Sequence, residues 1–434
     1  MNTLFYNGKV LTFGSSCEII EDGAVIVTGN TIEFAGSMAD KAYAGCREGA
    51  VFDREIDLKG NLIMPGFKNC HTHSAMTIFR SAADDLKLDE WLNTIIFPRE
   101  ALFTPDDIYY ATILAYMEYL TGGTTEVCEM YIDSDAVAKA AADTGFRTVQ
   151  CGAMNSFSES IDLLRSWYEK YNGDDGINSF RFGIHAEYTC SRELLQEVSE
   201  LIHEYRAPLY LHVAETEKEV KGCMERNSGQ SPVEYLDSLG LLDFGGVFFH
   251  GVHVTERDMD IMKKRNISVI TNPGSNTKLA SGIAPVCDYI KKGISLGIGT
   301  DGAGSNNCLD MFREMFLMTG LAKLRENDAS VMDAADVLRI ACSDGARVIG
   351  TEETDSLAPG KKADLIVIDL HSPNMQPENN IVKNIVYSGS KLNVRLTMID
   401  GVIRYEDGKF NIGFDPEDIY REVNKTVRRL ESAL

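Results

Sequence analysis

The chain alternates short apolar runs with amphipathic segments, and this alternation constrains its fold more than any other feature. Eight such runs have the length and composition of buried β-strands, and the residues between them repeat with helical period. Strands that are apolar throughout and alternate with helices are typical of a parallel sheet covered on both faces. Eight units predict a closed (β/α)8 TIM barrel of the α/β class, with strands at 62–67, 124–131, 147–154, 181–184, 208–213, 246–249, 267–271 and 295–300.

Two of the intervening segments carry clear helix signals. Thr104 precedes Pro105 and two aspartates, which predicts an N-cap, a proline at the first helical position and acids at the positive end of the helix dipole. Gly122 is expected to end this helix. A second helix, with apolar residues at helical spacing after residue 193, is expected to stop before Pro208.

The two ends of the chain differ from its middle. Residues 1–61 and 355–412 contain short alternating segments separated by turn residues, and Asp400–Gly401 has the composition of a hairpin turn. Neither end alone buries much surface, so we expect the two to pair into one small β-sandwich domain. The barrel domain is then expected to span residues 62–354, and residues 413–434 are expected to form a C-terminal helix.

The charge and the cysteines restrict the possible partners and the compartment. With 42 basic and 65 acidic residues the formal net charge is −23, which argues against binding nucleic acid or an anionic membrane. No apolar run approaches the roughly 20 residues of a membrane span. The N-terminus has no export signal and the ten cysteines lie far apart, so we expect a cytoplasmic protein with reduced thiols.

Histidines and acids gather at the ends of the predicted strands. Five of the eight histidines and one aspartate do so, namely His71, His73, His185, His212, His250 and Asp301. In an α/β barrel, side chains just past the carboxyl ends of the strands converge on one face. Taken singly, each has an ordinary explanation, such as a chance pair of histidines or a helix-capping aspartate. Taken jointly, three histidines and one carboxylate on one face indicate a divalent metal with a position left for water.

Several longer stretches resemble the amidohydrolase superfamily, in its branch of S-adenosylhomocysteine and methylthioadenosine deaminases, which is related to guanine deaminase and the triazine hydrolases. The matching stretches cover nearly the whole barrel in the expected order. They include PGFKNCHTH (65–73), DEWLNTIIFPRE (89–100), GIHAEYTCS (183–191), LHVAETEKEV (211–220), FHGVHVTERD (249–258) and GIGTDGAGSNNCLDMFREM (297–315). The resemblance also implies the small two-ended sandwich domain expected from the flanks.

The resemblance implies a role for each matching residue of the metal site. Four residues would bind one divalent ion, zinc first and iron or manganese as alternatives: His71, His73, His212 and Asp301. Asp301 would also accept the proton of the attacking water, and His250 would stabilise charge on its oxygen. Glu215 would carry protons to the ring nitrogen and then to departing ammonia.

Substrate contacts are implied at four further positions. Glu100 would bind the ribose hydroxyls with Trp91 nearby, His185 would contact the base or ribose, and Ser305 would line the same pocket. A surface glutamate and a buried, hydrogen-bonded histidine are the structural alternatives for Glu100 and His185. The family's arginine for a substrate carboxylate has no counterpart between residues 150 and 164, although Arg147 and Arg165 flank that stretch.

Three functions are therefore open at this point. The first is a metal-dependent deaminase that converts methylthioadenosine, S-adenosylhomocysteine or adenosine to its inosine analogue. The second is a deaminase or hydrolase of another aminated heterocycle, such as guanine, a pterin, a creatinine-like ring or a triazine. The third is a protein that binds a small molecule on an inactive barrel. This hypothesis predicts that a metal-binding residue or Glu215 is missing. All five of these residues are present, namely His71, His73, His212, Asp301 and Glu215. By analogy with the family, a homodimer or homotetramer is expected.

Overall fold

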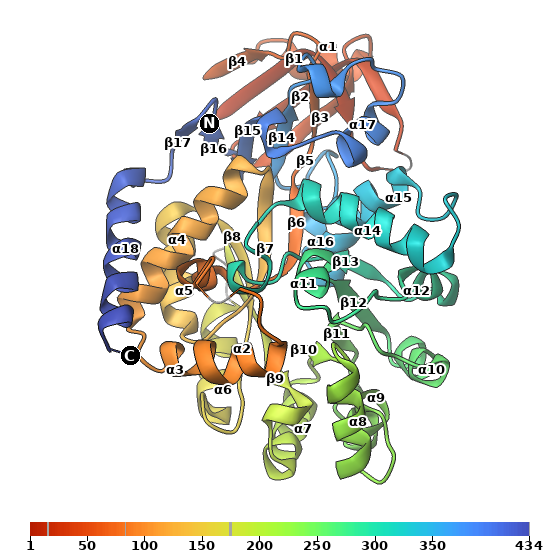
Figure 1. Ribbon diagram of the computed structural model, residues 1–434. Helices are drawn as coiled ribbons and strands as arrows, with labels where there is room; N and C mark the ends of the chain where they lie inside the picture. The colour runs from red at the N-terminus through yellow and green to blue at the C-terminus, as the bar shows by residue number, and fades with distance from the viewer. Residues whose placement is uncertain (15–16, 83, 173–175, 434) are drawn as a thin grey trace.

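The computed structural model describes residues 1–14, 17–82, 84–172 and 176–433, and within them the strands form two separate sheets (Figure 1). The larger part of the molecule is a barrel of eight parallel strands in chain order, ringed by helices. Its strands are β6 (Phe67–Thr72), β7 (Thr124–Met130), β8 (Arg147–Cys151), β9 (Asn178–Ala186), β10 (Leu209–Val213), β11 (Gly246–His250), β12 (Ile267–Thr271) and β13 (Leu296–Ile298). The predicted TIM barrel is confirmed.

The first and last barrel strands meet at the functional end. The backbone N–H of Asp301 donates to the carbonyl of His71 at 3.0 Å, and the N–H of Thr300 donates to Asn69 Oδ1 at 2.9 Å. These bonds bring residues that are 230 and 231 positions apart in the chain to one edge of the barrel. They fix the position of Asp301 relative to His71 in β6.

The strand predicted over 62–67 is wrong in its extent. Leu62–Pro65 is strand β5 of the other sheet, where Ile63 pairs with Val10 and Val367, and the first barrel strand begins only at Phe67. Both segments are fully buried, and the apolar run of β5 continues through Gly66 to Phe67, so apolarity does not mark where one strand ends and the next begins.

The helices follow the pattern read from the sequence. The α-helices are α1 (Lys41–Arg47), α2 (Leu88–Trp91), α3 (Phe97–Glu100), α4 (Pro105–Thr121), α5 (Ser134–Thr144), α6 (Ile161–Tyr171), α7 (Arg192–Tyr205), α8 (Glu217–Arg226), α9 (Pro232–Ser238), α10 (Glu256–Lys264), α11 (Pro273–Lys278), α12 (Val286–Lys292), α13 (Ala303–Asn306), α14 (Met311–Glu326), α15 (Ala334–Arg339), α16 (Gly345–Ile349), α17 (Ile381–Tyr387) and α18 (Pro416–Ala433). Shorter turns are η1 (Ser74–Phe79), η3 (Glu187–Thr189), η5 (Glu352–Thr354), η6 (Pro373–Met375) and η7 (Lys391–Asn393), with π-helical η2 (Leu92–Ile96) and η4 (Ile340–Asp344).

The predicted helix caps are confirmed. Thr104 and Asp107 form a reciprocal capping box at the start of α4, and Gly122 caps its end. Helix α7 ends at Tyr205, three residues before Pro208. Helix α18 begins at Pro416 and packs beside α4, where Thr426 Oγ1 donates to Asp107 Oδ1 at 2.6 Å (Figure 1).

The N- and C-terminal segments combine into a separate mixed sheet, as predicted. Its strands are β1 (Asn2–Leu11), β2 (Ile19–Thr28), β3 (Thr31–Ser37), β4 (Arg54–Asp57), β5, β14 (Leu365–Ile368), β15 (Val394–Ile399), β16 (Val402–Glu406) and β17 (Lys409–Phe410). Strand β5 joins the two ends because it pairs with both β1 and β14. Asp400 and Gly401 form the turn between β15 and β16 with φ of 51° and 74°. Positive φ values of this kind favour Asp and Gly in a two-residue hairpin turn.

The sequence also predicts reduced thiols and no membrane-spanning segment. All ten cysteines are free. Among the described residues, we find no helix with both the length and the apolarity needed to cross a bilayer.

A buried ion pair links the barrel to the mixed sheet. Arg147 of β8 donates from Nε and Nη2 to the two carboxylate oxygens of Asp364 at 2.7 and 3.1 Å, and both side chains are almost fully buried. Removing one partner of such a pair leaves an uncompensated charge and costs about 3–5 kcal/mol. We therefore expect Arg147→Met to lower the free energy of unfolding by that amount in urea denaturation.

The exposed pair Lys139–Asp143 provides the matched control. Its side chains are 64% and 37% exposed, and pairs of this kind contribute about 0–1 kcal/mol. Lys139→Met should change the free energy of unfolding by no more than that. Equal effects of the two substitutions would contradict the role given to Arg147.

Candidate metal centre

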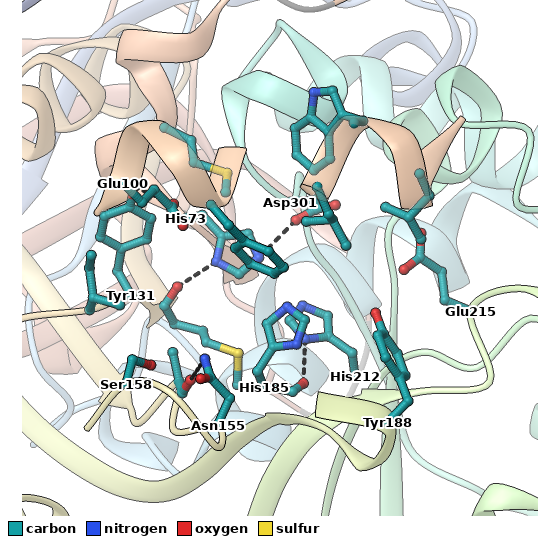
Figure 2. A pocket seen from close by; sticks show the side chains of 18 of the residues that line it. His73, Glu100, Tyr131, Asn155, Ser158, His185, Tyr188, His212, Glu215 and Asp301 are labelled. Atoms are coloured by element: carbon teal, nitrogen blue, oxygen red, sulfur yellow. Dashed lines mark hydrogen bonds and ion pairs between the residues drawn. The ribbon is translucent and has the colours of Figure 1, made fainter. Parts of the chain in front are cut away.

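Four of the predicted side chains meet at the carboxyl ends of the barrel strands. His71 lies in β6, His73 just after it, His212 in β10 and Asp301 after β13. One ligand atom from each lies within 4.8 Å of the others. His73 Nε2 is 3.1 Å from Asp301 Oδ1, and His71 Nε2 is 3.6 Å from the same oxygen. Figure 2 shows His73, His212 and Asp301 converging from separate elements.

The backbone and neighbouring rings fix the orientation of the three imidazoles. His73 Nδ1 donates to the carbonyl of Met130, and His212 Nδ1 donates to the carbonyl of His185 at 2.7 Å. His71 stacks on Phe249 with ring centroids 3.8 Å apart. A histidine whose Nδ1 carries the hydrogen presents an unprotonated Nε2, which is the form that binds metals.

These side chains fit a divalent cation. His71 Nε2 and His212 Nε2 face each other at 3.1 Å, an arrangement of lone pairs that a cation between them stabilises. Burial lowers the pKa of His71 to about 3 and that of His212 well below its usual range, so both are neutral. Burial alone would lower the pKa of His73, but its contact with Asp301 raises it to about 9. A bound cation would displace that proton.

Hydrogen bonds hold Asp301 in a strained backbone conformation. Its φ of 58° is unusual for a residue other than glycine, and His250 shares this feature with a φ of 71°. Ser275 Oγ and Ser305 Oγ donate to Asp301 Oδ2 at 2.6 and 2.8 Å. Burial alone would raise the pKa of Asp301, but hydrogen bonds from His71 and His73 hold it well below its usual range. The carboxylate is therefore ionised.

His250 and Glu215 lie beside the four-residue cluster. His250 Nε2 is 3.9 Å from both Glu215 Oε2 and Asp301 Oδ2, and its Nδ1 donates to Asn276 Oδ1 at 2.8 Å. Ser281 Oγ donates to Glu215 Oε1 at 2.9 Å, which leaves Oε2 toward His250. Burial raises the pKa of Glu215 against the opposing effect of His250. A carboxyl group with a raised pKa is suited to carry a proton.

A pocket opens from this cluster and contains most of the predicted substrate contacts. Trp91, Glu100 and His185 line it together with His73, His212, Glu215, His250 and Asp301. Tyr131 OH donates to Glu100 Oε1 at 2.7 Å, and burial raises the pKa of Glu100 to about 7 although this bond opposes the rise. Burial lowers the pKa of His185 to about 4, so that its ring is neutral.

Ser305 lies apart from these residues. It is almost fully buried behind Asp301, to which it donates, and it is not part of the pocket wall. His253 likewise lies outside the cluster, because its Nε2 bonds the carbonyl of Ser281.

Sequence reasoning assigned no role to several residues that position the site. Ser275, Asn276 and Ser281 support Asp301, His250 and Glu215 respectively, and Tyr131 supports Glu100. The sequence feature that points to the first three of these residues is the polar stretch NPGSNTKLASG after the seventh predicted strand. A run of small polar residues past a barrel strand indicates a loop on the functional face.

Comparison with known proteins finds one family model and several relatives that match most of the chain. The family model described as the amidohydrolase family matches residues 62–404. A protein of Pelotomaculum thermopropionicum named 5-methylthioadenosine/S-adenosylhomocysteine deaminase is 36% identical over 437 residues, which cover 99% of each chain. A protein of Methanobrevibacter smithii named 5'-deoxyadenosine deaminase is 38% identical over 420 residues, which cover 95% of this chain and 94% of that relative.

A solved structure agrees with these relatives. The crystal structure of an adenosine deaminase from Xanthomonas campestris with bound zinc superimposes with a TM-score of 0.92. It is 32% identical in sequence, and the match covers 99% of this chain and 98% of the other. The similarity therefore includes both the barrel and the sheet formed by the two ends.

Proposed function

We propose, from the premise that this chain belongs to the amidohydrolase family, that it is a metal-dependent deaminase of adenine nucleosides. The reaction replaces the amino group at C6 of the base by oxygen from water and releases ammonia. The observation that carries the proposal is that one pocket joins the metal cluster to the two glutamates. His73, His212 and Asp301 of the cluster line this pocket together with Glu215 and Glu100, and His71 completes the cluster. The relatives named for methylthioadenosine and 5'-deoxyadenosine support this substrate class.

One zinc ion is the proposed cofactor, with iron or manganese as alternatives. Three nitrogen donors and one carboxylate suit zinc, and the similar adenosine deaminase contains zinc. A divalent ion held by these four residues would lower the pKa of its bound water to about 7.

The protein's own residues then move the protons. Asp301, ionised and close to both His71 and His73, accepts a proton from the attacking water. His250, with its Nδ1 hydrogen held by Asn276, presents Nε2 to the attacking oxygen, and with both ring nitrogens protonated it donates from Nε2 and stabilises the charge on that oxygen. Glu215 Oε2 takes up a proton as the attacking water ionises and delivers it to N1 of the adenine ring. The proton accepted by Asp301 then passes through Glu215 to the departing ammonia, so that both protons of the water are placed.

Glu100 is proposed to hold the ribose, with Trp91 and His185 around the nucleoside. A carboxylate accepts hydrogen bonds from two vicinal hydroxyls, and Glu100 lies in the same pocket as Glu215. Ser305 would act on the substrate only through Asp301, by holding its Oδ2.

Replacing Glu100 tests this contact. Hydrogen bonds to charged groups contribute about 1.5–3 kcal/mol, so Glu100→Gln should raise KM for adenosine about 10- to 100-fold and change kcat less. Because the pKa of Glu100 is raised to about 7, the ionised acceptor predominates above that pH. KM of the parent enzyme should therefore fall as the pH rises through 7, and this dependence should disappear in the variant. With 2′,3′-dideoxyadenosine, which lacks both hydroxyls, the substitution should change little.

Ammonia release from a substrate panel tests the function itself. We expect turnover of adenosine, methylthioadenosine or 5'-deoxyadenosine, with the absorbance change of adenine becoming hypoxanthine. Turnover confined to guanine, a pterin, a creatinine-like ring or a triazine would contradict the adenine nucleoside as substrate and assign the enzyme to that other heterocycle. No ammonia from any compound with metal-loaded protein would favour a binding protein.

We further propose the organisation of the whole chain. The barrel domain would begin after β5 and extend to residue 354, the sheet domain would comprise the strands of 1–65 and 355–412, and 413–434 would dock on α4 as a helix. By analogy with the family, the protein would form homodimers or homotetramers and act in the cytoplasm on a small heterocyclic substrate.

A further inference from the structure

The pocket has two chemically different ends. In Figure 2, Glu215 lies on one side of the histidines, and Glu100, Tyr131, Asn155 and Ser158 lie on the other. A nucleoside with its adenine ring at Glu215 and its ribose at Glu100, as proposed above, would extend its C5′ substituent toward the second end. The residues that line this second end, apart from Glu100 and Tyr131, are called here the outer wall.

The outer wall is apolar and neutral. We assign to it the pocket-lining residues Leu88, Leu92, Phe97, Ile132 and Phe157, with Asn155 and Ser158 as its polar residues. Phe97 and Phe157 meet edge to face, with ring centroids 5.7 Å apart, and Phe157 is 67% exposed at the mouth. The amide of Asn155 is already bonded to the backbone, since it donates to Ala153 and accepts from Phe157.

No lysine or arginine lines the pocket among the residues that the structure describes. Arg99 donates to the carbonyl of Ile95 in its own helical segment, and Arg165 pairs with Glu204 on the outer helices. Arg147 is buried against Asp364, where β8 meets the mixed sheet. The charged side chains of the pocket, apart from its histidines, are the acids Glu100, Glu215 and Asp301.

We propose, resting on the nucleoside deaminase function above, that the outer wall selects an uncharged 5′ substituent and rejects one that carries a carboxylate. A carboxylate placed there would lose water, would meet no cation and would be repelled by the acids of the pocket. Small groups such as the hydrogen of 5'-deoxyadenosine or the methylthio group of methylthioadenosine lose no charged hydration. S-adenosylhomocysteine, whose amino-acid end carries an ammonium beside the carboxylate and would lose the hydration of both charges, is therefore a poor substrate.

Four nucleosides separate charge from size. They are 5'-deoxyadenosine, methylthioadenosine, 5′-butylthioadenosine and S-adenosylhomocysteine, and the third has the same chain length as the fourth without its charges. We expect kcat/KM for the first three nucleosides to agree within about tenfold. We expect kcat/KM for S-adenosylhomocysteine to be lower than theirs by a factor of at least about 100. Equal rates for all four would overturn the inference but leave the proposed function intact. A butylthio compound as slow as S-adenosylhomocysteine would also overturn it, because size would then be decisive. No turnover of any nucleoside would instead contradict the proposed function.

A substitution at the mouth tests the missing cation directly. Phe157 is mostly exposed, so Phe157→Arg should fold and place a guanidinium at the outer wall. We expect it to raise kcat/KM for S-adenosylhomocysteine relative to methylthioadenosine by about tenfold. Phe157→Leu, which removes the same ring without adding charge, should leave that ratio unchanged. The same ratio in both variants would count against a role for charge.

Discussion

Glu215→Gln is expected to lower kcat for methylthioadenosine by about 10²–10⁴-fold while leaving the metal content of the protein unchanged. The amide retains the size of the carboxyl group and its hydrogen bond from Ser281, but it cannot carry a proton. Glu215 is also no member of the four-residue metal cluster. Steady-state kinetics at saturating substrate, together with elemental analysis of the same sample, measure both quantities.

Glu217 provides the matched control for this substitution. It lies two residues further along the same loop and helix start, and its side chain is 68% exposed and paired with Lys221. Glu217→Gln should leave both kcat and metal content unchanged. Loss of metal in Glu215→Gln, or a kcat within a few-fold of the parent, would refute the shuttle role.

His212→Ala is expected to lose both metal and activity, with a larger fall in kcat than Glu215→Gln. His212 Nε2 lies 3.1 Å from His71 Nε2, and its Nδ1 bond to His185 holds the ring in the orientation that binds metal. Without this donor, two nitrogens and one carboxylate remain. The measurement is elemental analysis after dialysis against metal-free buffer, followed by assay with and without added zinc.

His203→Ala is the corresponding control. His203 lies on α7, is 43% exposed and pairs with Asp243 far from the pocket. This variant should retain metal and activity. A His212→Ala protein that keeps stoichiometric metal would remove His212 from the ligand set.

Much of the barrel could be predicted because its strands are buried on both sides. Seven of the eight predicted runs overlap observed barrel strands closely, as at 267–271, and the polar residues after them converge as barrel geometry requires. The exception is 62–67, where two buried strands of different sheets follow each other with only Gly66 between them. Hydrogen-bond partners, rather than apolarity, decide which sheet each strand joins.

The metal ligands were easier to predict than the substrate contacts. His71, His73, His212 and Asp301 stand out jointly, because they recur at the ends of separate predicted strands that converge on one face of a barrel. Ser305 and Trp91 carry no such signal, and only the fold shows that Ser305 points at Asp301 while Trp91 lines the pocket. The absence of a basic outer wall also required the structure, since the positions of Arg147 and Arg165 depend on distant partners, Asp364 and Glu204.

Titration of metal-free protein with zinc tests the central claim, that one cation held by three histidines and an aspartate is required for the reaction. The account predicts that protein stripped by a chelator is inactive, and that deaminase activity rises linearly to a plateau at one equivalent of zinc per chain. Full activity in protein shown by elemental analysis to hold no metal would contradict it.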